Sequence, residues 1–518
     1  METLRFKNYR CFEDTGDVEI RPITVLIGAN SSGKSSFLKF FPLIKQSMGE
    51  MVNGVFLWAG PLVDMKDFAN TVRTGNDYLT IEYSIDKLHL QKNFAMRRAS
   101  ESNVRLEMYV TKRDVFFDYL QRLSIKTDYF TAEILYYPDN TARVVLNDVD
   151  SKELEEEIHW DVNNALIPKL YYNRQGKRAS IEENSIKARE ELVKELKEFG
   201  IEEEKWHQFL SPYRQDVFNG KSATTILQKV DKEGKRESHY KRIVDLLQYY
   251  HLNQVIDSIN LYFIYLSRKV TYVMPLRAIA ERYYRFQNYS VKEIDADGKN
   301  LPMFYSSLSE DAFTDLNRWF YNIFGFTLEL RASEGHLEML IKEAGSDKAR
   351  NLTDLGFGYT QVLPILTILW KVIVVDCING ADETFDYCKT HIVAIEQPEL
   401  HLHPRYQGLF ADMMAKVIEH CKAEKKDIRI IIETHSEIIV NRIGKLIAAD
   451  NCALDENDVN VVIFNGLKER LNSYVVQTKY DKAGYIEDWP YGFFSDYVDR
   501  NQEGYNRRGS EEKQSKAE

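Results

Sequence analysis

The chain contains little cysteine and no long apolar run. Its 518 residues include an odd number of cysteines without metal-site spacing, namely Cys11, Cys377, Cys388, Cys421 and Cys452. We therefore expect reduced thiols rather than a disulfide framework. A transmembrane helix needs about eighteen consecutive apolar residues, and no such run is present. Residues 1–16 also lack the apolar stretch of a signal peptide. These absences predict a cytoplasmic protein without a membrane partner.

Basic side chains are outnumbered by acidic ones, which gives a net charge of −11 and a pI near 5.7. The protein as a whole does not attract nucleic acid, so any contact with DNA needs a local basic patch. Residues 169–178 and 282–286 interleave basic and aromatic side chains, which suits base stacking and phosphate neutralisation. In an acidic chain with 31 tyrosines, a solvated or packed face explains such clusters better. DNA binding stays open.

Hydrophobic periodicity divides the chain into four parts. The first, residues 1–149, begins with a strand, a glycine-bearing loop and a helix, and then changes to the period-two alternation of an antiparallel β lobe. Residues 150–268 have a charged helical pattern and predict a helical insertion. Residues 269–498 alternate strands and helices, which indicates a mostly parallel sheet, and residues 499–518 form a polar tail that we expect to be disordered. The predicted fold class is α/β.

A phosphate-binding loop is the strongest feature of the sequence. Residues 28–35, GANSSGKS, fit the pattern G-x-x-x-x-G-K-[ST] directly after an apolar strand and before a helix. Glycines let the backbone wrap phosphates, and successive N–H groups supply positive potential. Lys34 is expected to reach the β- and γ-phosphates of ATP, and the Ser35 hydroxyl to ligate Mg²⁺. The residues predicted to bind nucleotide here are Asn30, Ser31, Ser32, Gly33, Lys34, Ser35 and Ser36.

Two later strands end in side chains that complete such a site. The first reads HIVAIEQPE over residues 391–399, so that Glu396 ends an apolar strand and is predicted to hold Mg²⁺ directly or through water. The second strand ends in Glu433-Thr434-His435-Ser436, where His435 would contact a γ-phosphate. Taken alone, His435 is more often a structural histidine, but the other two elements favour a catalytic role.

A glycine-containing loop, LGFGYTQ over residues 355–361, precedes a helix. Its backbone N–H groups suit phosphate binding, although a helix-capping turn explains the pattern equally well. The residues predicted to bind nucleotide here are Gly356, Gly358, Thr360 and Gln361. Glu399, His401 and His403 alternate along the chain and offer a zinc site, but their place after the acidic strand end makes metal binding the minor alternative.

The elements GANSSGKS, LGFGYTQ, AIEQPELHLHP and ETHS, in this order, resemble the ATPase part of the overcoming-lysogenization-defect (OLD) family. The chain is also similar to related ATPases of prokaryotic antiviral defence that carry a Trp-Pro-x-Gly-Phe-Phe segment, matched by residues 489–494. The resemblance covers residues 1–80 and 270–495. It implies an ABC-type P-loop ATPase head, with a mixed sheet and an antiparallel β lobe, in which two protomers enclose two ATP molecules. The loop at 356–361 of one protomer would face residues 28–35 of the other.

One departure from that pattern concerns hydrolysis. Most ABC-type heads have a catalytic glutamate after the acidic strand end, and this chain has Gln397. An amide orients water but does not accept its proton. Glu399, two positions on, is the alternative base. We therefore expect slow turnover, with ATP serving mainly to hold the assembly together.

The sequence after His435 is too short for the metal-dependent nuclease domain of OLD nucleases and contains no D-x-D pair, so we expect no nuclease activity of this chain itself. We therefore predict a nucleotide-dependent switch, a homodimer or larger homo-oligomer, that controls a separate effector such as a nuclease or toxin. The alternative is a DNA repair or recombination ATPase that binds DNA directly. A transporter subunit is disfavoured by the large insertion.

Overall fold

The computed structural model describes residues 2–90, 101–114, 116–161, 165–172, 185–206, 224–225, 227–228, 231, 237–287, 290–376, 388–449, 452–466 and 473–487. The predicted tail at 499–518 and the segment at 489–494 lie outside these residues. Among the described helices, none is long and apolar enough to cross a membrane.

A parallel sheet forms the centre of the molecule. Hydrogen bonds join its strands in the order β13 (Val270–Val273), β18 (Thr390–Glu396), β19 (Asp427–Glu433), β4 (Ile23–Gly28) and β20 (Val459–Gly466), and β21 (Ser473–Thr478) pairs antiparallel with β20. Alternate residues of these strands enter two different hydrophobic cores: Leu26 belongs to one, whereas Val25 and Ile27 belong to the other. Both faces are therefore covered, as a parallel sheet requires, and the α/β prediction is confirmed.

An antiparallel lobe continues the same sheet. Strand β1 (Thr3–Tyr9) pairs with β2 (Phe12–Asp14), β3 (Val18–Glu19) and β5 (Tyr78–His89), and β2 touches β21, which joins the lobe to the parallel strands. From β5 the ladder runs through β6 (Glu101–Lys112), β7 (Asp118–Thr127), β8 (Thr131–Tyr136) and β9 (Thr141–Leu146). The period-two alternation within residues 1–149 predicted this lobe.

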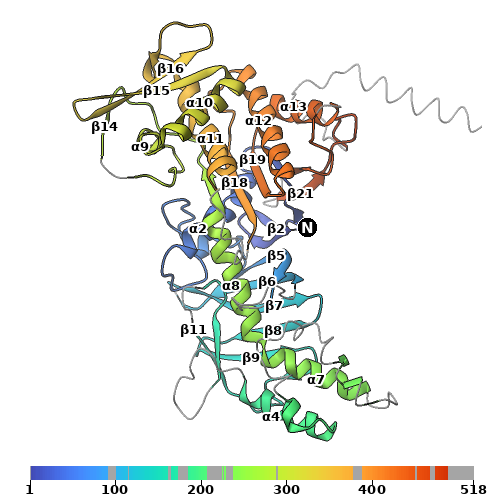
Figure 1. Cartoon of the computed structure of the whole chain (residues 1–518). Coiled ribbons are helices and arrows are strands. Elements are labelled where there is room, and N and C mark those ends of the chain that lie inside the picture. The colour runs from blue at the N-terminus through green and yellow to red at the C-terminus, as the bar shows by residue number, and fades with distance from the viewer. Residues whose placement is uncertain are drawn as a thin grey trace, which may run out of the picture.

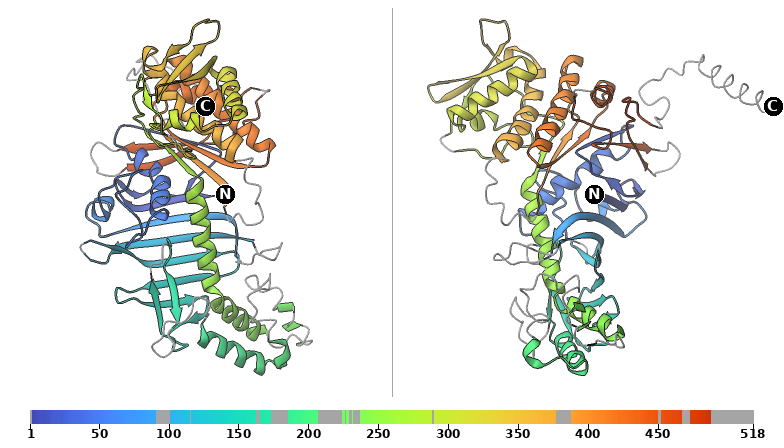
Figure 2. Two further views of the ribbon diagram at one scale, coloured as in Figure 1. Left: turned by 60° about the vertical axis from the view of Figure 1, so that its left-hand side comes forward. Right: turned by 45° about the vertical axis from the view of Figure 1, so that its right-hand side comes forward.

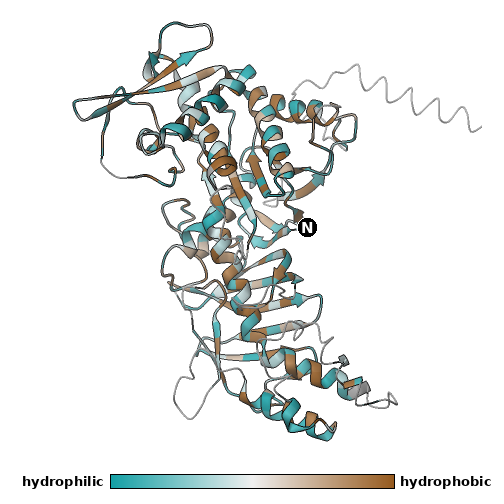
Figure 3. Cartoon of the chain, viewed as in Figure 1, coloured by the Kyte–Doolittle hydropathy of each residue, from teal (hydrophilic) through white to brown (hydrophobic). Residues whose placement is uncertain are grey.

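The expectation of helix from residue 150 onward is wrong at its start. Strands β10 (Val149–Asp150), β11 (Ile158–Asp161) and β12 (Lys169–Tyr172) extend the antiparallel ladder. These strands are only two to four residues long, so the charge pattern around them hid them. The helices follow: α4 (Ile186–Glu198), η1 (Glu203–Lys205), α7 (Glu237–Tyr250) and α8 (Leu252–Lys269). Polar and apolar residues alternate along α4 and α7 (Figure 3).

The remaining helices cover the two faces of the parallel strands. On the side of the antiparallel lobe lie α1 (Lys34–Leu38), α2 (Phe40–Met48) and α3 (Phe68–Thr71). On the other side lie α9 (Leu301–Ser306), α10 (Glu310–Phe324), α11 (Phe357–Lys371), α12 (Pro404–Ala423) and α13 (Glu437–Ile447), with η2 (Leu352–Asp354) and η3 (Val372–Asp376). A separate small sheet contains β14 (Tyr284–Arg285), β15 (Phe326–Ser333), β16 (His336–Glu343) and β17 (Arg350–Asn351).

These parts form an elongated molecule (Figure 1). Helices α9 to α13 lie at one end, α4 and α7 lie at the other, and α8 runs along the antiparallel strands between them, as both views of Figure 2 also show. Strands β4, β18 and β19 meet where the two halves of the chain join. The predicted site residues at 30–36, 396–399 and 435 follow or end these three strands at their carboxyl ends.

Candidate nucleotide-binding site

The loop between β4 and α1 has a backbone that only glycine permits at two positions. Gly28 and Gly33 have φ angles of 154° and 105°. A Cβ on Gly28 would lie 2.3 Å from the carbonyl oxygen of Phe464, and one on Gly33 would lie 2.3 Å from Cζ of Phe12. Strand β20 and the β1–β2 turn therefore press against the loop, and the glycines permit this close approach.

Lys34 is held beneath this loop. Its Nζ donates hydrogen bonds to the carbonyl oxygens of Gly28 at 3.0 Å and Ala29 at 2.8 Å, and lies 3.9 Å from Oε1 of Glu433. The residue is only 3% exposed. Burial lowers the pKa of the ammonium, and the carboxylates of Glu433 and Glu399 oppose that shift. A buried cation therefore faces the loop in a position suited to an anionic ligand.

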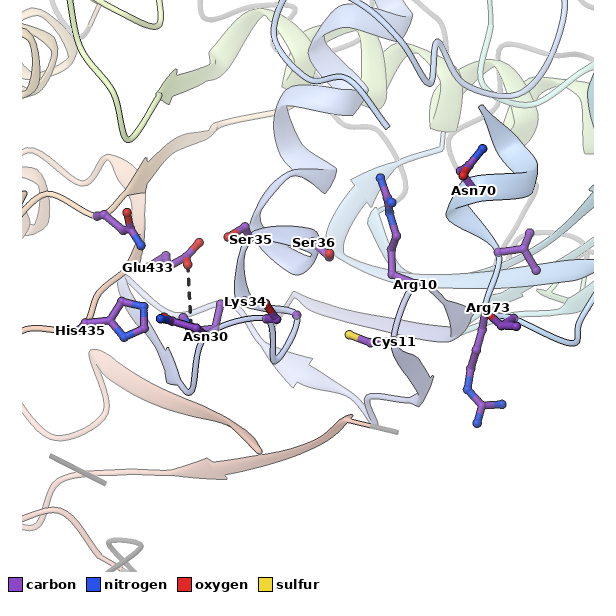
Figure 4. A pocket seen from close by; sticks show the side chains of 15 residues that line it. Arg10, Cys11, Asn30, Lys34, Ser35, Ser36, Asn70, Arg73, Glu433 and His435 are labelled. Atoms are coloured by element: carbon purple, nitrogen blue, oxygen red, sulfur yellow. Dashed lines mark ion pairs between the residues drawn. The ribbon is translucent and has the colours of Figure 1, made fainter. Parts of the chain in front are cut away.

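A cavity of about 630 Å³ opens beside the loop, and we call it the P-loop cavity. Figure 4 shows Glu433 and His435 at one end, Arg10, Asn70 and Arg73 at the other, and Lys34, Ser35 and Ser36 between them. Eight predicted residues line the cavity: Asn30, Ser31, Gly33, Lys34, Ser35, Ser36, Gln397 and His435. The structure thus brings together the strand ends that the sequence places about 360 to 400 residues apart.

In the described part of the chain, seven other lining residues were not predicted: Arg10, Cys11, Asn70, Val72, Arg73, Thr74 and Glu433. Arg10 and Cys11 come from the β1–β2 turn, and the other cavity-lining residues between 70 and 74 lie in α3 and directly after it. No local pattern marks these residues. Glu433, by contrast, ends an apolar strand as Glu396 does, so the sequence pattern that identified Glu396 could also have identified Glu433.

Glu396 ends β18, is 3% exposed and is not among the described residues that line the cavity. Its Oε1 accepts a 2.7 Å hydrogen bond from the Tyr272 hydroxyl and lies 3.8 Å from Nζ of Lys39. Burial raises the pKa of this carboxyl, and the Lys39 charge opposes the shift. A carboxylate and the Ser35 hydroxyl are oxygen ligands of the kind that Mg²⁺ prefers. The donor types of Ser35 and Glu396 therefore suit a magnesium ion, and of the two side chains Ser35 alone is among the described residues that line the P-loop cavity.

A buried arginine holds the turn after Glu396. The Arg277 guanidinium donates to the carbonyl oxygens of Glu396 at 2.9 Å and of Gln397 at 3.5 Å. Gln397 has a φ of 44°, and its backbone N–H donates to the carbonyl oxygen of Glu433 at 2.8 Å. Burial lowers the pKa of Arg277 to about 10. These contacts fix the turn so that the Gln397 side chain lines the cavity.

Glu399 faces the end of β19 rather than the cavity. Its Oε2 accepts a 2.8 Å hydrogen bond from the Thr434 hydroxyl, and its Oε1 accepts a 2.7 Å bond from the backbone N–H of His435. Burial raises the pKa of Glu399, and these bonds oppose the shift. Burial, together with the charge of Lys34, lowers the pKa of His435, which favours its neutral imidazole.

The loop at 355–361 lies outside the P-loop cavity. None of Gly356, Gly358, Thr360 and Gln361 is among the described residues that line the P-loop cavity. A Cβ on Gly358 would lie 3.8 Å from the carbonyl oxygen of His401, so the loop packs against the turn that follows β18. Ser32 is buried beneath the phosphate-binding loop and is 1% exposed.

The zinc alternative finds no support in the described part of the chain, where no group of three or more histidine, cysteine, aspartate or glutamate side chains is arranged to hold a metal ion. Both oxygens of Glu399 accept hydrogen bonds, and Nδ1 of His403 accepts one from the backbone N–H of Arg405. His403 thereby caps α12.

Three solved structures align with nearly the whole chain at low similarity. An SMC head bound to the C-winged helix domain of ScpA has 12% identity and a TM-score of 0.33, covering 93% of this chain and 98% of that one. The SMC head domain from Thermotoga maritima has 11% identity and a TM-score of 0.33, covering 92% and 97%. The recombination mediator RecF has 10% identity and a TM-score of 0.31, covering 92% and 97%. Such low scores carry no inference about ligands or activity.

A curated relative matches part of the sequence. Endonuclease GajA of Bacillus cereus (strain HuB5-5) is 25% identical over 190 residues, which are 36% of this chain and 23% of GajA. The match thus spans less than a quarter of that protein. The profile of the AAA ATPase domain family matches residues 1–440, which include every element around the P-loop cavity. The chain therefore belongs to the AAA ATPase domain family.

Proposed function

We propose that this protein is a nucleotide-dependent switch that binds ATP in the P-loop cavity, hydrolyses it slowly and controls a separate effector. The observation that carries the proposal is the position of Lys34, buried under a glycine-constrained loop at a cavity that Gln397, Glu433 and His435 also line. The loop N–H groups, the start of α1 and Lys34 would bind the triphosphate.

Magnesium would be held by Ser35 and Glu396, where it neutralises phosphate charge when bound. Gln397 would orient water, and neutral His435 would donate a hydrogen bond from its ring N–H to a γ-phosphate oxygen. Because Gln397 carries no acidic group, we expect turnover well below that of an ATPase with a glutamate at this position.

Dimerisation through ATP is the second part of the proposal. The loop at 356–361 lies beside the turn after β18 and away from the P-loop cavity of its own chain. In a homodimer or larger homo-oligomer, this loop would complete the cavity of a second copy, with its glycines admitting close backbone approach to phosphate. Antiviral defence is the proposed setting, supported by the resemblance to OLD-type ATPases and by partial similarity to GajA.

The test combines nucleotide turnover with oligomer mass for wild type, Lys34→Ala and Gln397→Glu. We expect wild type to bind ATP, assemble and hydrolyse slowly, Lys34→Ala to lose ATP binding, and Gln397→Glu to hydrolyse faster. A protein that stays monomeric with ATP and hydrolyses rapidly would contradict the proposal.

A direct action on DNA is the second candidate. The observation that favours it is the exposure of Tyr283 and Phe286, 56% and 44%, next to Arg282 and Arg285. Arg282, however, pairs with Asp354. Salt-sensitive DNA binding and ATP turnover stimulated by DNA would support this candidate, and cleavage of DNA by the purified chain would contradict the prediction that it has no nuclease activity.

A further inference from the structure

Among the three carboxylates at or near the ends of β18 and β19, Glu433 has the fewest polar partners in the described part of the chain. It is 3% exposed, its Oε1 lies 3.9 Å from Nζ of Lys34, and its Oε2 has no hydrogen-bond partner among the described residues. Burying a carboxylate oxygen without a partner costs free energy. Such an arrangement is typical of a group whose partner arrives with the ligand.

The neighbouring acidic residues are already engaged. Glu396 accepts a hydrogen bond from Tyr272 and faces Lys39. Both oxygens of Glu399 accept hydrogen bonds from residues 434 and 435. Neither Glu396 nor Glu399 is among the described residues that line the cavity, whereas Glu433 is.

Strand order places Glu433 beside the phosphate-binding loop. Strand β19 is hydrogen-bonded directly to β4, with Glu433 opposite Leu26. Strand β18 lies one position further away, with Glu396 opposite Glu433. Of these two strand-end carboxylates, Glu433 is therefore on the strand adjacent to the loop, and Figure 4 shows it next to Lys34 and His435.

Gln397 and Glu433 line the same end of the cavity. The backbone N–H of Gln397 donates to the carbonyl oxygen of Glu433 at 2.8 Å, which joins the two strand ends. An amide orients a water molecule without accepting its proton, and a carboxylate accepts one. A single catalytic glutamate would both orient the water and accept its proton. Here Gln397 could orient the water and Glu433 could accept the proton.

We propose that Glu433 accepts the proton of the water that attacks ATP. This inference rests on the proposed ATPase function. The water oxygen forms a bond to the γ-phosphorus while the bond from that phosphorus to the β,γ-bridging oxygen breaks, and the electron pair leaves with ADP. The water proton passes to the Glu433 carboxylate, and Gln397 holds the water.

The experiment measures kcat, KM and equilibrium ATP affinity for Glu433→Gln, for Glu433→Gln combined with Gln397→Glu, and for Glu437→Gln. Glu437 is an exposed carboxylate in the first turn of α13 and serves as the matched control. We expect Glu433→Gln to lower kcat about 100-fold or more, the usual size of a general-base contribution. Its ATP affinity should stay within about threefold of wild type, because glutamine has nearly the same shape as glutamate. The substitution removes one negative charge near Lys34 and leaves Lys34 itself unchanged.

Recovery of kcat by a second substitution distinguishes a general base at Glu433 from a carboxylate that only neutralises Lys34. Gln397→Glu in the Glu433→Gln background should recover about tenfold or more of the lost kcat, because it restores a carboxylate at the same end of the cavity. If Glu433→Gln fails to fold, Glu433→Asp keeps the carboxylate and should lower kcat about tenfold with unchanged affinity.

The inference is overturned if Glu433→Gln retains wild-type kcat, if kcat and ATP affinity fall together, or if Gln397→Glu restores nothing. Hydrolysis by wild type that survives Glu433→Gln contradicts this inference alone. Absence of any hydrolysis by wild type contradicts the proposed function as well.

Discussion

The backbone N–H of His435 donates a 2.7 Å hydrogen bond to Oε1 of Glu399, and this bond couples the turn after β18 to the end of β19. The Thr434 hydroxyl binds the other oxygen at 2.8 Å and accepts a 3.0 Å bond from the backbone N–H of Ser436. Glu399 thus positions the segment that carries His435. The sequence offered Glu399 as an alternative base, and its contacts favour a positioning role.

The Thr434 hydroxyl tests that coupling. Thr434→Val removes a donor to a buried carboxylate and an acceptor for Ser436, so we expect a loss of about 2 kcal/mol in the free energy of unfolding and slower ATP turnover. Thr434→Ser keeps the hydroxyl and should remain close to wild type. Urea denaturation and turnover assays measure both effects, and equal behaviour of the two variants would contradict the coupling.

Tyr272 is expected to affect the pKa of Glu396 and its binding of Mg²⁺. Tyr272→Phe removes the 2.7 Å hydrogen bond to the carboxylate, and the pKa of Glu396, already raised by burial, should rise further. We therefore expect the Mg²⁺ concentration for half-maximal turnover to increase several-fold, with little change in metal-free ATP affinity. Tyr474→Phe, at a 45% exposed position on β21, is the control. An unchanged Mg²⁺ dependence would remove Glu396 from the proposed metal site.

Two helical glycines should respond to alanine in opposite ways. A Cβ on Gly444 of α13 would lie 2.2 Å from the carbonyl oxygen of Gly484, whereas one on Gly408 of α12 meets nothing within 4 Å. Gly444→Ala should destabilise the protein by about 2 kcal/mol because backbone must move. Gly408→Ala should stabilise it by about 0.5–1 kcal/mol because glycine is a poor helix former. Urea denaturation compares the two, and destabilisation by Gly408→Ala would contradict this packing.

Asp118 gives the antiparallel lobe a pH dependence. It accepts hydrogen bonds from the Val55 N–H and the Trp58 indole, and burial raises its pKa from 3.8 to about 6. The folded state therefore binds this proton more tightly than the unfolded state does, and the stabilisation is lost as pH rises toward and through 6.

Asp118→Asn removes that ionisation. We compare the free energy of unfolding of the variant with that of wild type at pH 5 and at pH 7.5. The difference should shift in favour of the variant by about 1 kcal/mol between these pH values. The altered hydrogen bonds add the same offset at both pH values and do not affect this shift. Urea denaturation at the two pH values measures this difference. A constant difference would show that Asp118 has an ordinary pKa.

Residues close together in sequence determined the phosphate-binding loop. A strand, two glycines, Lys34 and a following helix lie within a short segment, so local pattern specifies both backbone and chemistry. The apolar strands ending at Glu396 and Glu433 and the helices after them were predicted for the same reason. The helix predicted after the phosphate-binding loop is divided into α1 and α2 at Lys39.

Tertiary structure decided which side chains surround that loop. Arg10, Asn70 and Arg73 reach the cavity, and Arg277 reaches the turn after β18, through strand pairing and packing that span tens to hundreds of residues. The sequence by itself therefore determined that this chain has a phosphate-binding loop, because that chemistry is encoded by neighbouring residues. Only the tertiary structure decided that Glu433 lies beside Lys34 while Glu399 supports His435, because the order of parallel strands in a sheet is set by long-range packing rather than by local pattern.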